Sequence, residues 1–171
     1  MSVIKIGLII FGLIILFSAL YAFGPGSRER LEKILSIPTP PPKVDFRTLE
    51  LHDRPNQFLV CPDDLCSTAR AHLKAPTFDI PADQLLAQFQ SVALDQQDVK
   101  RIEYDTSDLK IDFVQRTKTM RYPDIVTVQA VPIDENSSTL AIYSRSVFGH
   151  SDFGVNEKRI RHWLNELNSR I

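Results

Sequence analysis

The fold class of this chain is clearest in the stretch PDIVTVQAVPIDENSSTLAIYSRS, residues 123–146. Residues 123–133 are rich in β-branched side chains, and residues 138–146 alternate apolar with polar side chains. The connector between them is short and polar, as the loop of a β-hairpin should be. A period of two is typical of a strand with one buried face, so this stretch predicts two antiparallel strands.

Two more strands are expected immediately before this hairpin, over residues 98–105 and 108–116. In the second of them Leu109, Ile111 and Phe113 alternate with polar residues. The connectors are again short and polar, so the four strands should pair in chain order as an antiparallel meander. A fifth short strand is possible at QFLVC, residues 57–61.

An amphipathic helix is expected on each side of the meander, over residues 80–97 and 157–171. Pro81 suits the first helical position of the first, and Asn156 is a good N-cap for the second. The apolar stripes are Leu85, Leu86, Phe89, Val92 and Ala93 in the first, and Ile160, Trp163, Leu164, Leu167 and Ile171 in the second. The predicted class is α+β: a four-stranded antiparallel meander with two helices packed on one face.

The N-terminal region differs from the rest of the chain in its long apolar stretch. IGLIIFGLIILFSALYAF, residues 6–23, carries no charge, and as a helix it would span roughly 27 Å, close to the thickness of a bilayer core. A retained single-pass transmembrane helix is favoured over a cleaved signal peptide, because Phe17 and Leu20 stand where a cleavage site needs small residues. The expected organisation is an anchor over 1–24, a short helix and Pro-rich stalk over 25–53, and a globular domain over 54–171.

Cys61 and Cys66 are five residues apart in a Pro-containing loop and can close a small disulfide ring. Disulfides persist in oxidising compartments, which places the domain outside the cytoplasm; two unrelated thiols are the alternative. A lone C-x4-C pair lacks the second ligand pair of a zinc site. We predict no metal and no cofactor. The net charge of −1 offers no basic footprint for nucleic acid.

A meander brings chemistry-bearing residues to one edge of the sheet. The second strand's end, the third strand's start and the fourth strand's end should lie together there, next to the loop 147–156. The residues predicted to gather into a binding site are Arg116, Arg121, Asp124, Arg145, Ser151, Asp152 and Asn156. Arginines with exposed loop amides suit an anion or a lipid head group.

The run SRSVFGHSDFGVN, residues 144–156, admits other interpretations. Serines beside His150 and Asp152 have the ingredients of a serine hydrolase, but no G-x-S-x-G elbow surrounds them. We therefore predict no catalytic residue and keep a serine-type hydrolase as an alternative. The simplest interpretation is a strand-to-helix connection, with glycines in turns and Asp152 bonding nearby amides.

The run SRSVFGHSDFGVNEKRI, with YPD at 122–124, resembles the family catalogued as domain of unknown function 1499, found in bacteria with plastid relatives. The matching positions are Ser144, Ser146, Gly149, Ser151, Asp152, Gly154, Asn156 and Arg159, with Pro123 and Asp124 upstream. The likeness covers roughly residues 54–170. Family members commonly carry Tyr where His150 stands, which argues against His150 as a required base. The resemblance implies a domain and not a reaction.

These observations predict a non-enzymatic, single-pass protein of the bacterial inner membrane with its domain in the periplasm. Its expected partners are the membrane and a lipid head group or an envelope protein. A structural accessory subunit of a membrane complex is the other alternative.

Overall fold

The structure is a computed structural model that describes residues 3–38 and 40–171. Residues 1, 2 and 39, which fall in the predicted anchor and stalk, lie outside the described part. The chain forms two compact units. One runs to Ser36 and includes Thr119–Arg121, and the other comprises Ile37–Lys118 and Tyr122–Ile171.

The N-terminal unit contains helices α1 (Val3–Phe23) and α2 (Ser27–Ile34). Among its described residues, no single helix has the length and apolar character needed to cross a membrane. Gly7–Ala22 and Ser27–Ile34 meet these requirements only as a pair, bent by 77°. The predicted single transmembrane helix is therefore not found as such.

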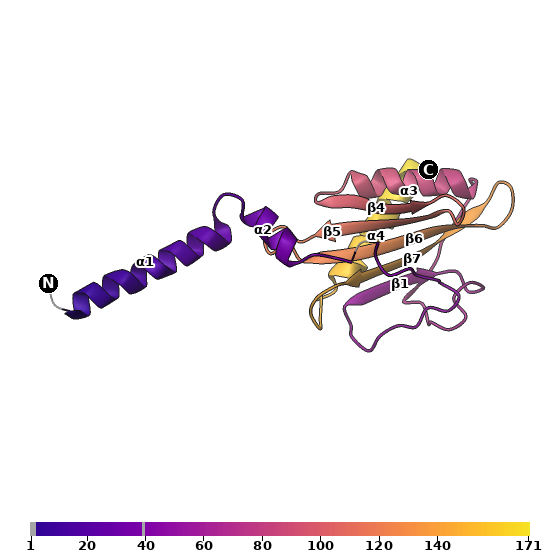
Figure 1. The fold of residues 1–171 in the computed structure, drawn as a ribbon. Helices are drawn as coiled ribbons and strands as arrows, with labels where there is room; N and C mark the ends of the chain where they lie inside the picture. Colours follow the sequence, from indigo (N-terminus) through magenta and orange to yellow (C-terminus); the bar gives the residue numbers. More distant parts are fainter. Residues whose placement is uncertain (1–2, 39) are drawn as a thin grey trace. The chain divides into compact units, whose positions relative to one another are not determined.

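The second unit is built on the predicted meander (Figure 1). Each strand pairs antiparallel with the next in the chain. The four strands are β4 (Val99–Asp105), β5 (Lys110–Arg116), β6 (Pro123–Pro132) and β7 (Ser138–Ser146). The α+β class, the strand order and the strand bounds are confirmed within one or two residues.

The sheet is larger than the predicted four-stranded meander, because seven strands form one sheet across the described residues, and the fifth strand expected at residues 57–61 is one of them. β1 (Gln57–Cys61) pairs antiparallel with β7, β2 (Leu73–Lys74) pairs parallel with β1, and β3 (Thr77–Phe78) pairs with β7. The two-residue strands are too short to show a period in the sequence, and their pairing is decided by distant partners.

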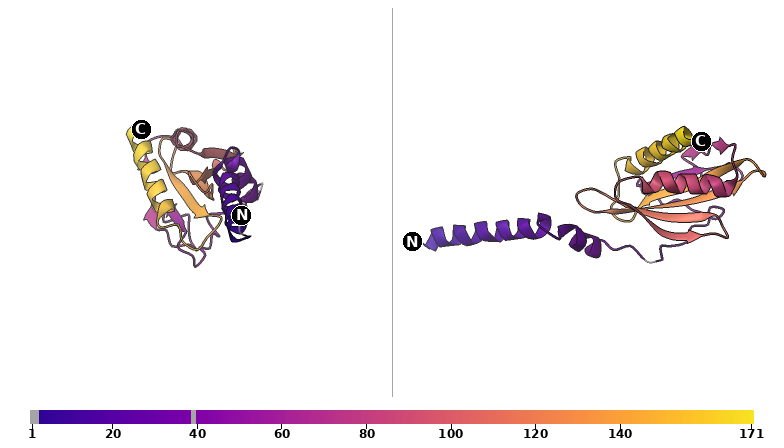
Figure 2. Two further views of the ribbon diagram at one scale, coloured as in Figure 1. Left: turned by 90° about the vertical axis from the view of Figure 1, so that its left-hand side faces the viewer. Right: turned by 90° about the horizontal axis from the view of Figure 1, so that it is seen from above.

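Helices α3 (Ala82–Leu94) and α4 (Val155–Arg170) both cover one face of the sheet, as expected (Figures 1 and 2). Their apolar stripes close a core over the inward residues of β5, β6 and β7. At its centre Trp163 meets the rings of Phe89 and Phe113 edge-on, with ring centroids 5.9 and 6.3 Å away. Such edge-to-face pairs add to the stabilisation that burial provides.

The opposite face of the sheet is covered in part by the segment before and after β1. Val44 and Phe46 are buried there with Leu59 of β1 and Tyr143 of β7. The domain therefore begins before residue 54, inside the range expected to be stalk. The prolines of that range are concentrated at positions 38 and 40–42, just before Val44 and Phe46, which are isolated apolar residues with no periodicity of their own.

Candidate functional site

The end of the sheet where β5 and β7 finish and β6 starts is the predicted site edge. Arg116 pairs with Pro123, and Asp124 pairs with Ser146. The Ser146 amide also donates to the Asn56 carbonyl at 3.0 Å, which adds the start of β1 to this edge. The strand ends that the meander predicts to meet are thus together.

Strand alternation divides the predicted residues between the two faces of the sheet. Asp124 and Ser144 point toward helix α4, where they bond to its side chains. Arg145, the next residue along β7, points to the opposite face and bonds Thr127 Oγ1 at 3.1 Å. Consecutive strand residues face opposite ways, so Arg145 cannot share a site with Asp124 even though the two lie at the same edge.

Asn156 is the centre of a buried polar network on the helix face. Its Nδ2 donates to Asp152 Oδ2 at 2.7 Å, to Ser146 Oγ at 3.1 Å and to the Asn56 carbonyl at 3.2 Å. Its Oδ1 accepts from Ser144 Oγ at 2.5 Å and from Arg159 Nη1 at 2.6 Å. The side chain is fully buried, and both ends of its amide are satisfied.

Arg159 joins this network to the neighbouring strands. Its Nη2 donates to Asp124 Oδ2 at 2.5 Å, and both side chains of this ion pair are 6% exposed. Its Nε donates to Gln115 Oε1 at 2.5 Å and its Nη1 to Ser144 Oγ at 3.0 Å. A buried charge held this way needs its partner, because an unpaired charge in the interior is strongly destabilising.

Asp152 holds the start of α4. Its Oδ1 accepts from the Gly154 amide at 3.0 Å and its Oδ2 from the Asn156 amide at 2.8 Å. These bonds satisfy amides that a helix start otherwise leaves unpaired. The prediction of Asn156 as N-cap is wrong, because α4 begins at Val155 and Gly154 occupies the cap position. Asn156 lies in the first turn, where its side chain turns inward.

The residues of the hydrolase alternative do not form a triad. Ser144 is buried and bonded to Asn156 and Arg159. His150 and Ser151 are exposed in the loop, and the Ser151 hydroxyl accepts from the Phe153 amide at 3.3 Å. Within the described residues no hydrogen bond joins a serine of this run to His150.

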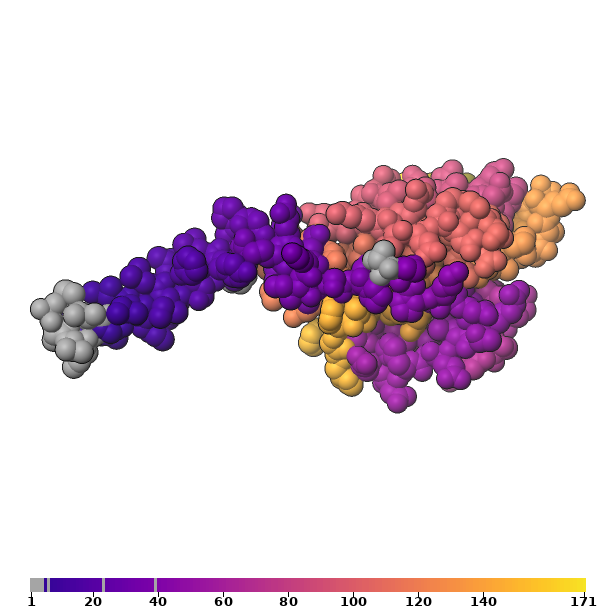
Figure 3. All heavy atoms as spheres, viewed as in Figure 1, coloured from indigo at the N-terminus to yellow at the C-terminus, as the bar shows by residue number. Residues whose placement is uncertain are grey.

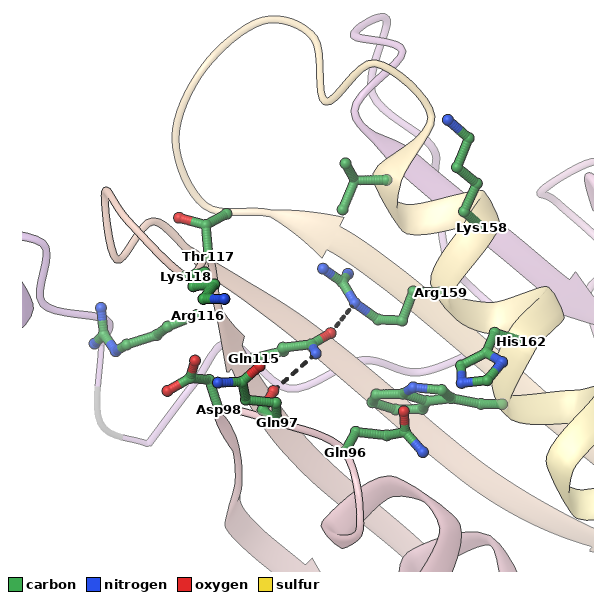
Figure 4. A pocket seen from close by; sticks show the side chains of 12 residues that line it. Gln96, Gln97, Asp98, Gln115, Arg116, Thr117, Lys118, Lys158, Arg159 and His162 are labelled. Atoms are coloured by element: carbon green, nitrogen blue, oxygen red, sulfur yellow. Dashed lines mark hydrogen bonds between the residues drawn. The ribbon is translucent and has the colours of Figure 1, made fainter.

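The two remaining predicted arginines lie outside the network. Arg121 belongs to the N-terminal unit, where its Nη2 is 2.5 Å from Glu32 Oε1. Arg116 is at the end of β5, and its side chain extends away from Arg159 (Figure 4).

Arg145 is part of a second polar group, on the open face of the sheet. Its guanidinium lies 4.9 Å from the centre of the Tyr143 ring, and Tyr143 Oη donates to Gln57 Oε1 at 2.6 Å. Thr127 Oγ1 donates to Asp112, and burial raises the pKa of the Asp112 carboxyl despite that bond. Burial also lowers the pKa of Arg145.

A pocket of about 420 Å³ opens beside the Arg159 network, within the second unit. It lies between the first half of α4, the end of β5 and the turn before β4 (Figure 4). Arg159 Nε and the Gln97 carbonyl are linked through Gln115, whose Nε2 donates to that carbonyl at 3.1 Å. The full lining is Gln96, Gln97, Asp98, Gln115, Arg116, Thr117, Lys118, Val155, Lys158, Arg159, His162 and Trp163.

The lining of this pocket is predominantly basic. It has four basic side chains, at positions 116, 118, 158 and 159, against one carboxylate, Asp98. Arg159 is paired with Asp124, while Lys118 and Lys158 are exposed and have no carboxylate partner among the described residues. Side-chain amides of Gln96 and Gln97 and the ring of His162 add further hydrogen-bond donors. This chemistry suits an anion.

Several residues of the site were missed from the sequence. Gln115 and Asn56 gave no signal, because a single amide in a strand or loop is ordinary. Arg159 did give one: it lies at i−4 from Trp163 on the apolar stripe of the helix, where Asn156, which was predicted, lies at i−7. A charge and an amide on a buried stripe indicate a polar network.

The fold and site define a small α+β domain whose sheet end is closed by a buried Asn–Arg–Asp network beside a basic pocket. The chain belongs to the family described as Protein of unknown function (DUF1499), whose model matches residues 37–167. That range includes Val44 and Phe46 and every residue of the network. Comparison with curated proteins found no match.

Proposed function

We propose that this domain is a non-enzymatic binding module for an anionic ligand, and that the pocket beside Arg159 is its binding site. The observation that carries the proposal is the excess of cationic side chains in one pocket, with two lysines that no carboxylate neutralises among the described residues. Flexible lysines and fixed amide donors are a common way to hold phosphate or carboxylate oxygens.

The buried network supports binding by holding the pocket wall still. Arg159 and Gln115 are fixed on several sides, so the pocket's inner wall needs no reordering when a ligand enters. Preorganisation of this kind improves affinity by lowering the entropy lost on binding. Lys118 and Lys158 then contribute charge from the rim, where they remain solvated before binding.

The proposal places this domain at a bacterial inner membrane, on the periplasmic side. Support for the tether is the uncharged stretch 6–23, and support for the compartment is the bond between Cys61 and Cys66, whose sulfurs lie 1.96 Å apart. A head group or an anionic envelope component would then be within reach of the pocket.

Trp163 provides a direct test, because it lines the pocket and is the chain's single tryptophan. The full chain in a non-ionic detergent is titrated with sodium phosphate at constant ionic strength while tryptophan emission is followed. We expect a saturable change, weakened about tenfold or more in the double variant Lys118→Glu/Lys158→Glu, which corresponds to about 1.4 kcal/mol.

Arg70→Glu is the matched control, since Arg70 is exposed on the loop between β1 and β2 and does not line this pocket. It changes the charge by the same amount per site and should leave the titration unaltered. A titration that responds equally to chloride, or that survives the double lysine variant, would refute the proposed site.

A further inference from the structure

The loop that leads into α4 carries exposed aromatic side chains next to the basic pocket. Phe153 is 88% exposed and Phe148 is 40% exposed. Val155 and Lys158, two and five residues after Phe153, line the pocket. In Figure 4 this loop arches from the end of β7 to the start of α4 along the pocket's upper side.

Phe153 has a strained backbone as well as an exposed side chain. Phe153 has φ 53° and Gly154 has φ 76°, so two consecutive residues take the left-handed conformation. That conformation is unfavourable for a residue with a bulky side chain. The exposed apolar surface of the Phe153 ring also contributes no hydrophobic stabilisation, because it remains in water.

The turn around Phe153 is firmly held. The Phe153 amide donates to Ser151 Oγ, the Gly154 amide to Asp152 Oδ1, and the Val155 amide to the Asp152 carbonyl at 3.1 Å. The other end of the loop is attached by Asn56 Nδ2, which donates to the Gly149 carbonyl at 2.9 Å. The chain therefore holds a phenylalanine outward on a fixed support, and a strained, exposed residue that the surroundings maintain indicates a functional contact.

We propose that Phe153 and Phe148 insert into the interface of an anionic phospholipid bilayer, and that the adjacent pocket takes a phosphate group of that surface. This inference rests on the proposed function of the pocket. Phenylalanine side chains on a membrane-facing surface bury into the boundary between head groups and acyl chains, and lysines beside them are attracted to anionic lipids. Both kinds of group lie at the same end of the domain, and the gold-coloured loop stands out from the surface in Figure 3.

A fluorescent label on the loop tests the insertion in the full chain. His150→Cys places a single reactive thiol there, because His150 is exposed and Cys61 and Cys66 are bonded to each other. An environment-sensitive dye at this site is followed in vesicles of phosphatidylcholine with phosphatidylglycerol. We expect a blue shift and quenching by lipids brominated on the acyl chain.

Matched variants separate loop insertion from any association through the N-terminal helices. The label at Asn136→Cys, in the turn between β6 and β7 at the other end of the sheet, should remain in water. Adding Phe148→Ser/Phe153→Ser to the His150→Cys chain should weaken vesicle binding, as measured by the quenching, about tenfold. Vesicles of phosphatidylcholine alone should give a similarly weak signal.

The inference is overturned if the label at position 150 shows no more blue shift or quenching than the label at 136. It is also overturned if the phenylalanine substitutions leave the quenching at position 150 unchanged. If phosphate still changes Trp163 emission in that case, the anion pocket stands and its ligand comes from solution or from a protein. If the label inserts but phosphate does not bind, the proposed pocket fails and the insertion is carried by the aromatic residues alone.

Discussion

At the scale of single residues, Asn156 has the largest share of the contacts at the sheet end. It joins the residue before β1, strand β7, the loop and α4 through both ends of one amide. It lies in the same run of sequence as Ser144, Asp152 and Arg159, within the residues that the family model matches. The residues of this run therefore have a structural role: each of these side chains forms a hydrogen bond with another polar side chain of the buried network.

Replacing Asn156 with Ala should lower the free energy of unfolding by about 3 kcal/mol, because it leaves several buried donors and acceptors without partners. Urea unfolding of the full chain, followed by Trp163 emission, measures the change. Asn165→Ala is the matched control in the same helix, where Asn165 is exposed; it should change stability by less than about 0.5 kcal/mol. Equal effects of the two substitutions would contradict the assignment.

His72 gives a pH-dependent contribution. Its Nδ1 accepts from the Leu59 amide at 3.0 Å and its ring stacks on Phe58, and burial lowers its pKa, with Glu157 opposing the shift. The folded chain thus binds this proton less readily than the unfolded chain, whose histidine pKa is about 6.5. Stability from His72 is present above that value and is lost as pH falls toward the lowered folded pKa.

In His72→Asn the amide oxygen can accept from Leu59 without titrating. Between about pH 7 and pH 5, the unfolding free energy of the natural chain should therefore fall more steeply than that of the variant. Parallel profiles through this range would show that His72 contributes nothing to acid sensitivity.

At the scale of elements, the segment after β1 depends on the disulfide. Cys61 ends β1 and is buried beside Leu65 and Ala141, while Cys66 closes the turn that follows. The covalent link limits the freedom of a short loop in the unfolded chain and keeps that turn against the open face of the sheet.

The variant Cys61→Ser/Cys66→Ser should be less stable by about 2 kcal/mol, the value that chain entropy gives for so short a ring. Thermal unfolding with and without a reducing agent measures it. The reductant should destabilise the natural chain and leave the variant unaffected; a natural chain that is insensitive to full reduction would contradict the expectation.

At the scale of the whole molecule, the sheet ends in two different edges. β2 is only two residues long at one edge, and β4 carries Lys100, Arg101 and Glu103 with a shift of register between Arg101 and Glu103 at the other. Short strands, charges and bulges all hinder pairing with a second sheet. The sheet is thus protected from edge-to-edge association.

The variant Lys100→Val/Arg101→Val should associate in a concentration-dependent way, because it removes the charges that protect β4. Light scattering of the full chain over a concentration series detects this. Arg47→Val/Arg70→Val removes the same charge from exposed positions outside β4 and should scatter as the natural chain does. If the two variants scatter equally, the association results from the change in net charge, and the proposed protective role of the β4 charges is wrong.

The α+β class, the order of the meander and both amphipathic helices could be predicted from the sequence alone. These follow from local periodicity, since side chains alternate along a strand and return to one face of a helix every three or four residues. The edge at which Asp124, Asp152 and Asn156 meet also followed, because consecutive antiparallel strands fix which ends lie together.

The three-dimensional structure was needed to show on which face of the sheet each polar residue lies and which segment covers the second face. Arg145 and Asp124 lie on opposite faces of the sheet. Arg159 bonds Gln115, which is 44 residues away in the chain. β1 pairs with β7, and the Gln57–Tyr143 hydrogen bond joins residues 86 positions apart. The isolated Val44 and Phe46 are buried in a core cluster. Such pairings depend on which distant segments bury each other's polar and apolar groups together, and local periodicity carries no information about that choice.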